Sequence, residues 1–441
     1  MNKGARTLVH LVFFYTCIEG LVINIWTPAK LPYIYKDFAI IAVYIMLFLP
    51  NLGRLFSPSR SANELTAPVL FFSLVMAIYL ILFGTGLFVG LVALKQRLLY
   101  IPLISVGYFF LRSEDDLKGL LSMLSLYAVG VAAFGVYLYF TGPDGLRQLG
   151  AYYSAELYTS DYLLTTEKYW RVPGTFTSPG QYGAYLLFNG LIAVALLMTR
   201  AVLKPWKRIA AVSLILTILA MLVSGSRAPF VLLTGSVAIL LLLSRKVGRF
   251  AAWGLVGYAA LAFAFGFLGP GLKDRFASIA AYEHFERFQR TYFGQLFLPT
   301  LLENPLGSGL GVATIGARHF SQFREIELVE SYLGILAVET GVLGLGTFIW
   351  LAIAIGALIL RVRRYVLGLP AIELWHALAV YVLFTILILP VSTAIDHAPS
   401  NLYFWFSIGV LIKLADLEQR KRGAERAAGR RYAPLSSRAL Q

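Results

Sequence analysis

Residues Glu303–Gly346 read ENPLGSGLGVATIGARHFSQFREIELVESYLGILAVETGVLGLG. The first half is a glycine-rich loop carrying Arg318, His319 and Arg324, and the second is an apolar helix that begins with the carboxylate of Glu330. The apolar pattern continues to residue 360, which is long enough to cross a bilayer about 30 Å thick. Charge at the mouth of a membrane helix is costly, so this junction predicts a membrane protein with a functional site near the helix start.

The composition of the whole chain agrees with this interpretation. The 441 residues are 58% hydrophobic and 14% charged, with a mean hydropathy of +0.72, which excludes an ordinary soluble protein. We expect an all-α, polytopic membrane protein with one integral domain over 1–414 and a basic, disordered cytoplasmic tail over 415–441. Twelve spans are predicted: 8–25, 38–53, 67–83, 98–111, 119–140, 180–198, 209–223, 228–244, 250–269, 330–360 with a break near Gly341, 372–395 and 401–414.

The net charge of +15 could indicate nucleic acid, but its distribution indicates membrane topology instead. Six short segments on the predicted inner side carry 16 of the 38 Lys and Arg, and the tail from residue 413 carries 8, whereas three short outer segments carry 5. This asymmetry places both termini in the cytoplasm and the long loops 141–178 and 270–328 outside. Segment 84–97 is counted as an outer segment, either re-entrant or interfacial. The early helices look nearly free of buried charge, and Glu19 has no evident role.

Metal and disulfide chemistry find little support in the sequence. Cys17 is the single cysteine, and the five histidines lack the spacing of a metal site. No Asp-x-Asp motif occurs in the two long outer loops. We therefore expect no cofactor.

Two arginines precede predicted helices on the outer side. Arg227 lies in the short turn SGSRAP between two spans, where its planar fork suits a phosphate group. Arg171 closes the first long loop in RVPGTFTSPGQYGAYL, before a helix N-terminus that favours anions. The alternatives are a snorkelling arginine at residue 227 and a loop at 171–178 that needs Pro and Gly only to turn.

These motifs resemble those of the O-antigen ligase/polymerase superfamily, over the region of about 170–360. The Pro-Leu-Gly-x-Gly loop before a Leu-rich helix with Glu-Thr-Gly is one such motif, and Ser-Arg-Ala at Arg227 is a second. The third is Arg-x-x-Gly-x-Phe-x-x-Pro-x-x-x-Gly, which matches Arg171, Gly174, Phe176, Pro179 and Gly183. The resemblance implies that Arg227 contacts a lipid pyrophosphate.

The second outer loop contains RFASIAAYEHFERFQR, whose helical pattern places Arg287 and Arg290 on one face. Members of the superfamily carry an arginine about four helical turns before the Pro-Leu-Gly step. Arg290 fits that spacing best, and Arg287 and Arg275 are its neighbours. The alternative is a solvated amphipathic helix.

The residue that opens the helix departs from the ligase pattern, because ligases usually have a histidine where this chain has Glu330. Glu330 is a candidate general base that takes a proton from an acceptor hydroxyl, or else a carboxylate favoured by the helix dipole. His397, after Asp396, is a substitute base, with a capping role as the alternative for this pair. Glu339 is interpreted as structural or as the partner of an arginine.

The resemblance implies a metal-independent membrane glycosyltransferase with a GT-C-like fold. Its donor would be a glycan on undecaprenyl pyrophosphate at the outer face of a bacterial inner membrane, and its other partners a glycan acceptor, membrane lipid and a chain-length regulator protein. The missing histidine favours polymerisation in exopolysaccharide or O-antigen biosynthesis over ligation to a lipid A core. A polysaccharide flippase or other transporter is the alternative of another class.

Overall fold

The computed structural model describes residues 1, 3–25, 32–49, 59, 62–82, 86–150, 171–244, 266, 298–314, 329 and 331–431. All regular structure within these ranges is helical. Eight helices in the described ranges are long and apolar enough to cross a membrane. The predicted all-helical, polytopic architecture is therefore confirmed at this level.

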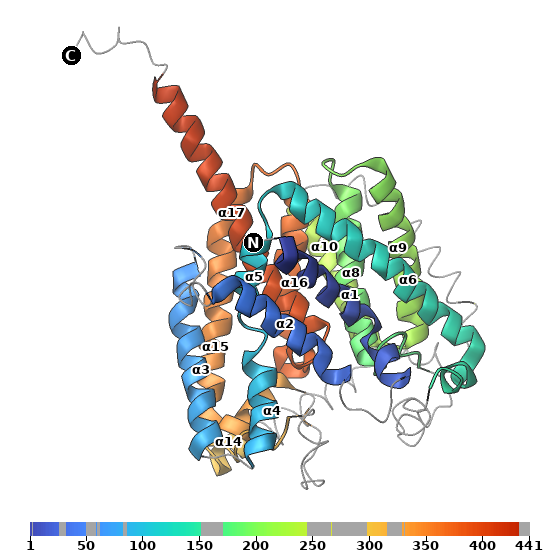
Figure 1. Cartoon of the computed structure of the whole chain (residues 1–441), viewed down its shortest axis with the longest axis vertical. Coiled ribbons are helices and arrows are strands. Elements are labelled where there is room, and N and C mark those ends of the chain that lie inside the picture. The colour runs from blue at the N-terminus through green and yellow to red at the C-terminus, as the bar shows by residue number, and fades with distance from the viewer. Residues whose placement is uncertain are drawn as a thin grey trace, which may run out of the picture.

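The helices are named in chain order (Figure 1). They are α1 (Lys3–Ile25), α2 (Pro32–Phe48), α3 (Asn63–Leu82), α4 (Leu87–Leu98), α5 (Leu103–Phe110), α6 (Glu114–Arg147), α8 (Pro179–Met198), α9 (Lys204–Ser224), α10 (Arg227–Leu243), α14 (Leu298–Glu303), α15 (Tyr332–Val366), α16 (Ile372–Ile388) and α17 (Ser400–Arg431), with short 3-10 turns η6 (Leu389–Val391) and η7 (Ala394–Asp396). The predicted span 250–269 lies outside the described residues, and α2 and α10 are apolar helices of 17 residues.

One predicted boundary differs in the structure. The sequence places 84–97 in an outer segment before a span at 98–111, whereas α4 and α5 together form one apolar helical stretch over 87–110 that is long enough to cross a membrane. The predicted span of 14 residues would be only about 21 Å long, too short for the bilayer core. Lys95 and Arg97 interrupt the hydropathy of the longer stretch, and both find carboxylate partners inside the protein.

Helix α8 forms the centre of the bundle, in contact with α6, α9, α10, α16 and α17. Helices α3, α4, α14 and α15 form a second group at the left of Figure 1. Helices α5 and α17 approach especially closely, because Gly107 and Gly409 each lie against the backbone of the other helix. Such small residues allow membrane helices to pack backbone to backbone.

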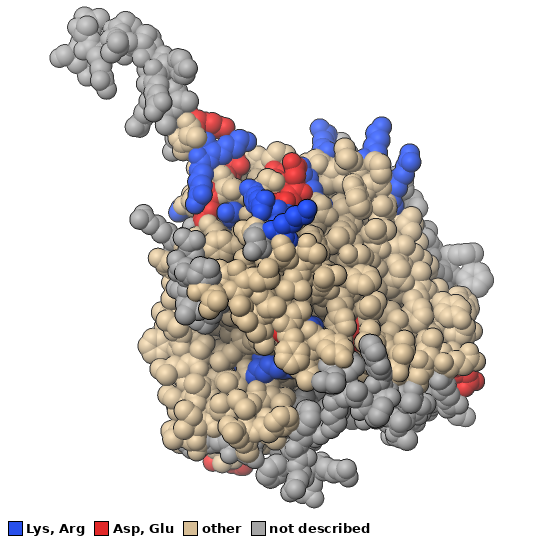
Figure 2. Space-filling view, viewed as in Figure 1, with Lys and Arg blue, Asp and Glu red and all other residues tan. Residues whose placement is uncertain are grey.

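Charged side chains gather at one end of the molecule, where α17 leaves the bundle, above a broad face that carries little charge (Figure 2). At this end Arg6 pairs with Asp116, and Arg112 donates to the carbonyl oxygen of Met1 at 2.5 Å. The N-terminus and the segment 112–118, both predicted to be cytoplasmic, thus lie together.

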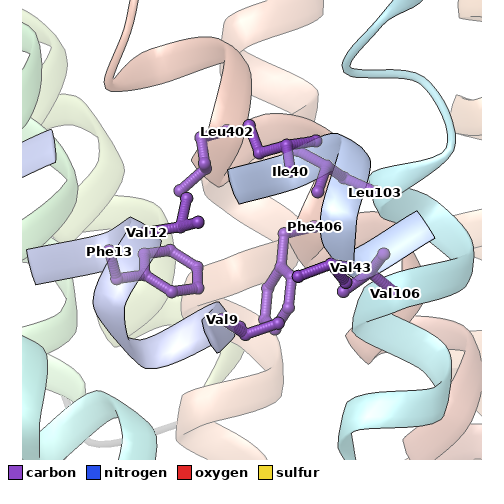
Figure 3. A pocket seen from close by; sticks show the side chains of 9 residues that line it. All are labelled: Val9, Val12, Phe13, Ile40, Val43, Leu103, Val106, Leu402 and Phe406. Carbon is purple, nitrogen blue, oxygen red and sulfur yellow. The ribbon is translucent and has the colours of Figure 1, made fainter. Parts of the chain in front are cut away.

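A small cavity separates α1, α2, α5 and α17 (Figure 3). Its walls are apolar side chains such as Val12, Ile40, Leu103 and Phe406, and its volume is about 10 Å³. That is at the lower limit for one water molecule. The cavity is a packing gap, and the functional site must be sought elsewhere.

The Pro-Leu-Gly loop packs onto a break in α15. Gly341 has φ 54° and ψ −148°, which interrupts the helix as the sequence predicts. The loop takes over the backbone hydrogen bonds that the break releases: Ser308 N–H donates to Val338 C=O at 2.7 Å, and Val342 N–H donates to Pro305 C=O at 2.9 Å. Buried backbone polar groups need hydrogen-bond partners within the protein, so loop and break require each other.

Two glycines make this contact possible. A Cβ on Gly307 would lie 2.7 Å from the carbonyl carbon of Glu339, and a Cβ on Gly341 would overlap the carbonyl oxygen of Pro305. Both residues also have positive φ, which other L-residues rarely adopt. The glycines of this motif therefore have a backbone reason in this fold.

We expect Gly341→Ala to lower stability by about 1–3 kcal/mol, because it adds backbone strain and a clash. Gly346→Ala on the same helix is the matched control, since a Cβ there meets nothing within 4 Å. The measurement is the temperature at which half of the detergent-solubilised protein loses its monodisperse chromatographic peak. Equal midpoints for the two variants would contradict the proposed role of Gly341.

Candidate functional site

A buried ion cluster lies next to the break in α15. Arg97 of α4 donates from Nη2 to Oε2 of Glu339 at 3.3 Å, and its Nη1 donates to Oδ1 of Asp396 in η7. The three side chains are 0%, 0% and 1% exposed, respectively. The guanidinium carbon of Arg97 also lies 4.9 Å from the ring centroid of Tyr332. One arginine thus joins three separate parts of the chain.

The same carboxylate of Glu339 holds the loop that precedes α15. Its Oε1 accepts hydrogen bonds from the backbone N–H of Ala313 at 3.0 Å and from the hydroxyl of Thr314 at 2.7 Å. Arg97 reaches Thr314 as well, at 3.2 Å. The loop 305–314 is therefore fixed by backbone bonds at Gly341 and by side-chain bonds at Glu339.

Glu339 does pair with an arginine, as the sequence predicts, but the partner is Arg97 rather than one of the arginines singled out from motifs. Asp396 also binds Arg97, whereas the sequence suggests a base or a capping role for the Asp396–His397 pair. Glu339 and Arg97 therefore hold the loop 305–314, α15 and η7 in fixed positions relative to one another.

A second ion cluster lies on the helices α1, α2 and α4. Glu19 pairs with Lys36, and Lys95 Nζ lies 2.7 Å from Oδ2 of Asp37. The hydroxyl of Tyr100 donates to Oδ1 of Asp37 at 2.8 Å. The expectation that the early helices carry almost no buried charge is therefore wrong, and Glu19 has a partner. We call Glu19, Lys36, Asp37 and Lys95 the α1–α2–α4 cluster.

His397 lies within electrostatic range of both clusters and is partly buried. Burial lowers the pKa of His397 to about 4, and the positive charges of Arg97 and Lys36 act in the same direction. Its imidazole is therefore neutral at pH 7 and can accept a proton or a hydrogen bond. An anion bound nearby would raise this pKa toward the range that suits a general base.

The segments that carry Arg171 and Arg227 meet at the N-terminus of α8. The hydroxyl of Ser226, next to Arg227, donates to the carbonyl of Pro179 at 2.9 Å. A Cβ on Gly183 would lie 2.8 Å from the Cβ of Ser226. Arg171 and Arg227 are both half-buried, and Arg227 is the first residue of α10, where the helix dipole favours anions.

The Arg171 segment also contacts α1 beside Glu19. The Thr175 hydroxyl donates to the carbonyl oxygen of Cys17 at 2.5 Å, and a Cβ on Gly20 would overlap the backbone of Phe176. The Arg171 segment therefore lies next to the α1–α2–α4 cluster, and the Arg227 segment contacts the far end of the Arg171 segment at Pro179. Arg275, Arg287, Arg290 and Glu330 lie outside the described residues.

Lys36, Asp37, Lys95 and Arg97 were not identified from the sequence. For Lys95 and Arg97 the sequence does hold a signal. The predicted span at 98–111 has only 14 residues, and extending it to a full membrane crossing takes in both residues. No protein-family model matches this chain, and no curated protein matches it. The geometry described above is therefore the basis for assigning a function.

We expect Arg97→Ala to lower stability by about 3–5 kcal/mol, because it leaves two buried carboxylates without their cation. The control is Arg361→Ala, which removes an exposed ion pair with Glu64 and should cost about 1 kcal/mol or less. Combining Arg97→Met with Glu339→Gln and Asp396→Asn should recover part of the loss, since no charge is then left unpaired. Thermal midpoints in detergent give all three values. An Arg97→Ala protein as stable as Arg361→Ala would disprove the role of the cluster.

Proposed function

We propose that this protein is a metal-independent membrane glycosyltransferase of GT-C-like architecture with twelve spans and both termini cytoplasmic. Its donor is a glycan linked to undecaprenyl pyrophosphate at the outer face of the bacterial inner membrane, and its reaction is polymerisation in exopolysaccharide or O-antigen synthesis. The observation that supports this best is the packing of three sequence motifs into the helix bundle. The Arg171 and Arg227 segments contact each other at α8, and the Pro-Leu-Gly loop docks on the break of α15.

In the proposed reaction an acceptor hydroxyl attacks the anomeric carbon of the donor glycan. A new glycosidic C–O bond forms, the bond from that carbon to the phosphate oxygen breaks, and undecaprenyl pyrophosphate leaves with the electron pair. In this proposal Arg171 and Arg227 neutralise the leaving group, together with Arg275, Arg287 and Arg290 from the second outer loop. The hydroxyl proton passes to a general base, for which Glu330 is the first candidate and His397 the second.

Ligation of the glycan to a lipid A core or another acceptor uses the same donor and the same leaving group. Polymerisation is preferred because the helix opens with Glu330 in place of the histidine of the ligases. Membrane lipid and a chain-length regulator protein are the further partners that this proposal implies.

A transporter is the second candidate, and one observation favours it. Ionisable side chains within membrane helices commonly mark ion or substrate pathways, and the α1–α2–α4 cluster is such a group. The described cations of this cluster are each matched by a carboxylate, however, so a free positive cavity for an anionic glycan lipid is not formed there.

We expect purified protein, incubated with lipid-linked oligosaccharide, to release undecaprenyl pyrophosphate and to yield longer lipid-linked glycans. Arg227→Lys should slow release by about 100-fold, because an ammonium cannot replace the bidentate fork at a pyrophosphate. Arg361→Lys, at the charged end of the bundle, is the control and should match the unmodified protein. Movement of the lipid-linked glycan across proteoliposomes with no release would identify a transporter.

We expect Glu330→Gln to slow transfer by about 100-fold or more while leaving donor binding intact, because the amide keeps the shape of the side chain but accepts no proton. His397→Ala should then be nearly silent. Initial rates of pyrophosphate release and donor binding are measured for each variant. An active Glu330→Gln beside an inactive His397→Ala of normal expression would assign the base to His397.

A further inference from the structure

The α1–α2–α4 cluster adds charges where two of its helices, α1 and α2, already pack closely. Helices α1 and α2 already pack through apolar side chains such as Val12 and Ile40. A buried ion pair is seldom more stable than apolar residues of the same volume. Two such pairs between apolar helices of a membrane-type protein therefore indicate a function beyond packing.

The cluster is accessible from one side. The side chain of Lys95 is 36% exposed, although Lys95 is the ninth residue of the span and lies about 12 Å along the helix from its start at Leu87. Its ammonium binds Asp37 inside the protein rather than extending toward the membrane surface. Figure 2 shows a small basic area in the lower half of the weakly charged face. A polar ligand can therefore reach the cluster at Lys95, whereas the side chains of Glu19, Lys36 and Asp37 are 10%, 11% and 3% exposed.

Aromatic side chains border the cluster. The rings of Tyr15 and Tyr35 lie 6.4 Å apart between centroids, at an interplanar angle of 64°. Tyr35 is 40% exposed and directly precedes Lys36 in α2, and Tyr15 lies one helical turn before Glu19 in α1. Tyrosines offer an apolar face together with a hydroxyl, beside carboxylates that accept and ammonium groups that donate hydrogen bonds. This set suits a sugar, which has apolar C–H faces and many hydroxyls.

The charge balance decides between a sugar and an anion. Glu19 is matched by Lys36 and Asp37 by Lys95, so the cluster has no net positive charge. A pyrophosphate would have to displace these carboxylates, whereas sugar hydroxyls can bridge them without breaking the pairs. The occupant that fits best is therefore an uncharged glycan.

We propose that the α1–α2–α4 cluster, with Tyr15 and Tyr35, is the binding site for the acceptor glycan, an inference that rests on the proposed glycosyltransferase function. The location agrees with such a role. Lys36 lies within electrostatic range of His397, and Gly20, next to Glu19, packs against the Arg171 segment. The acceptor would thus bind near a candidate base and beside the segment that carries Arg171.

Binding can be tested independently of catalysis. The probe is the pyrophosphate-free oligosaccharide obtained by mild acid treatment of the lipid-linked pool of the source bacterium, titrated into protein in nanodiscs and followed by isothermal calorimetry. We expect Tyr35→Leu and Asp37→Asn to raise its Kd about tenfold. Tyr137→Leu, at a tyrosine of α6 that is 58% exposed, is the control and should bind as the unmodified protein does. Tyr35→Leu keeps the ion pairs, so it stays informative if Asp37→Asn folds poorly.

The two variants should also separate the two halves of the reaction. Transfer to the acceptor should fall about tenfold, while slow hydrolysis of the donor by water, read as undecaprenyl pyrophosphate release, should stay unchanged. Equal Kd values for all proteins, absence of binding in the unmodified protein, or competition by inorganic pyrophosphate would each overturn the acceptor site. Absence of pyrophosphate release from the unmodified protein would instead refute the glycosyltransferase itself, whatever the binding result.

Discussion

The structure depends on the neutralisation of one arginine buried inside the protein. Arg97 cannot be buried in α4 without counter-charges, because an isolated guanidinium in a low-dielectric interior is very costly. Asp396 and Glu339 supply them from positions 299 and 242 residues further along the chain. The ion cluster therefore fixes α4, η7, α15 and, through Thr314, the loop before α15 in a single arrangement. Losing Arg97 would leave two buried carboxylates without a cation, so the stability of these four elements depends on this one side chain.

The break in α15 allows the backbone of the preceding loop to be held at the same place as the ion cluster. A continuous helix would satisfy its own carbonyls and leave the backbone groups of loop 305–314 without their hydrogen-bond partners in α15. Gly341 opens the helix, the loop fills the gap, and Glu339, two residues earlier, binds both the loop and Arg97. Backbone and side-chain bonds thus act on the same five-residue stretch. A rigid junction of this kind suits a site whose groups must be held in fixed positions relative to a membrane-bound substrate.

The sequence predicts the local features of this fold and misses those that depend on distant partners. Apolar runs identify most of the helices, and glycine chemistry identifies the break at Gly341, because both are properties of neighbouring residues. The span over 87–110 was misplaced because hydropathy counts Lys95 and Arg97 as charges, and their neutralisation by Asp37 and Asp396 is visible only in three dimensions. The same reason hid the role of Glu19. The motif arginines Arg171 and Arg227 lie on segments that do meet, whereas the predictions for Arg275, Arg287, Arg290 and Glu330 concern residues outside the described part of the chain.

The α1–α2–α4 cluster and the segments of Arg171 and Arg227 differ in charge, and this difference favours different ligands in the proposed function. In the α1–α2–α4 cluster every cation has its own carboxylate, which favours hydroxyl groups over phosphates. Arg171 and Arg227 are half-buried, on segments that join near the N-termini of α8 and α10, where helix dipoles add positive potential. An uncharged sugar and a pyrophosphate would therefore be drawn to adjacent but distinct places. Transfer of a glycan from a lipid pyrophosphate requires this separation, because the acceptor hydroxyl must approach the anomeric carbon from the side opposite to the leaving group when the reaction is a direct displacement.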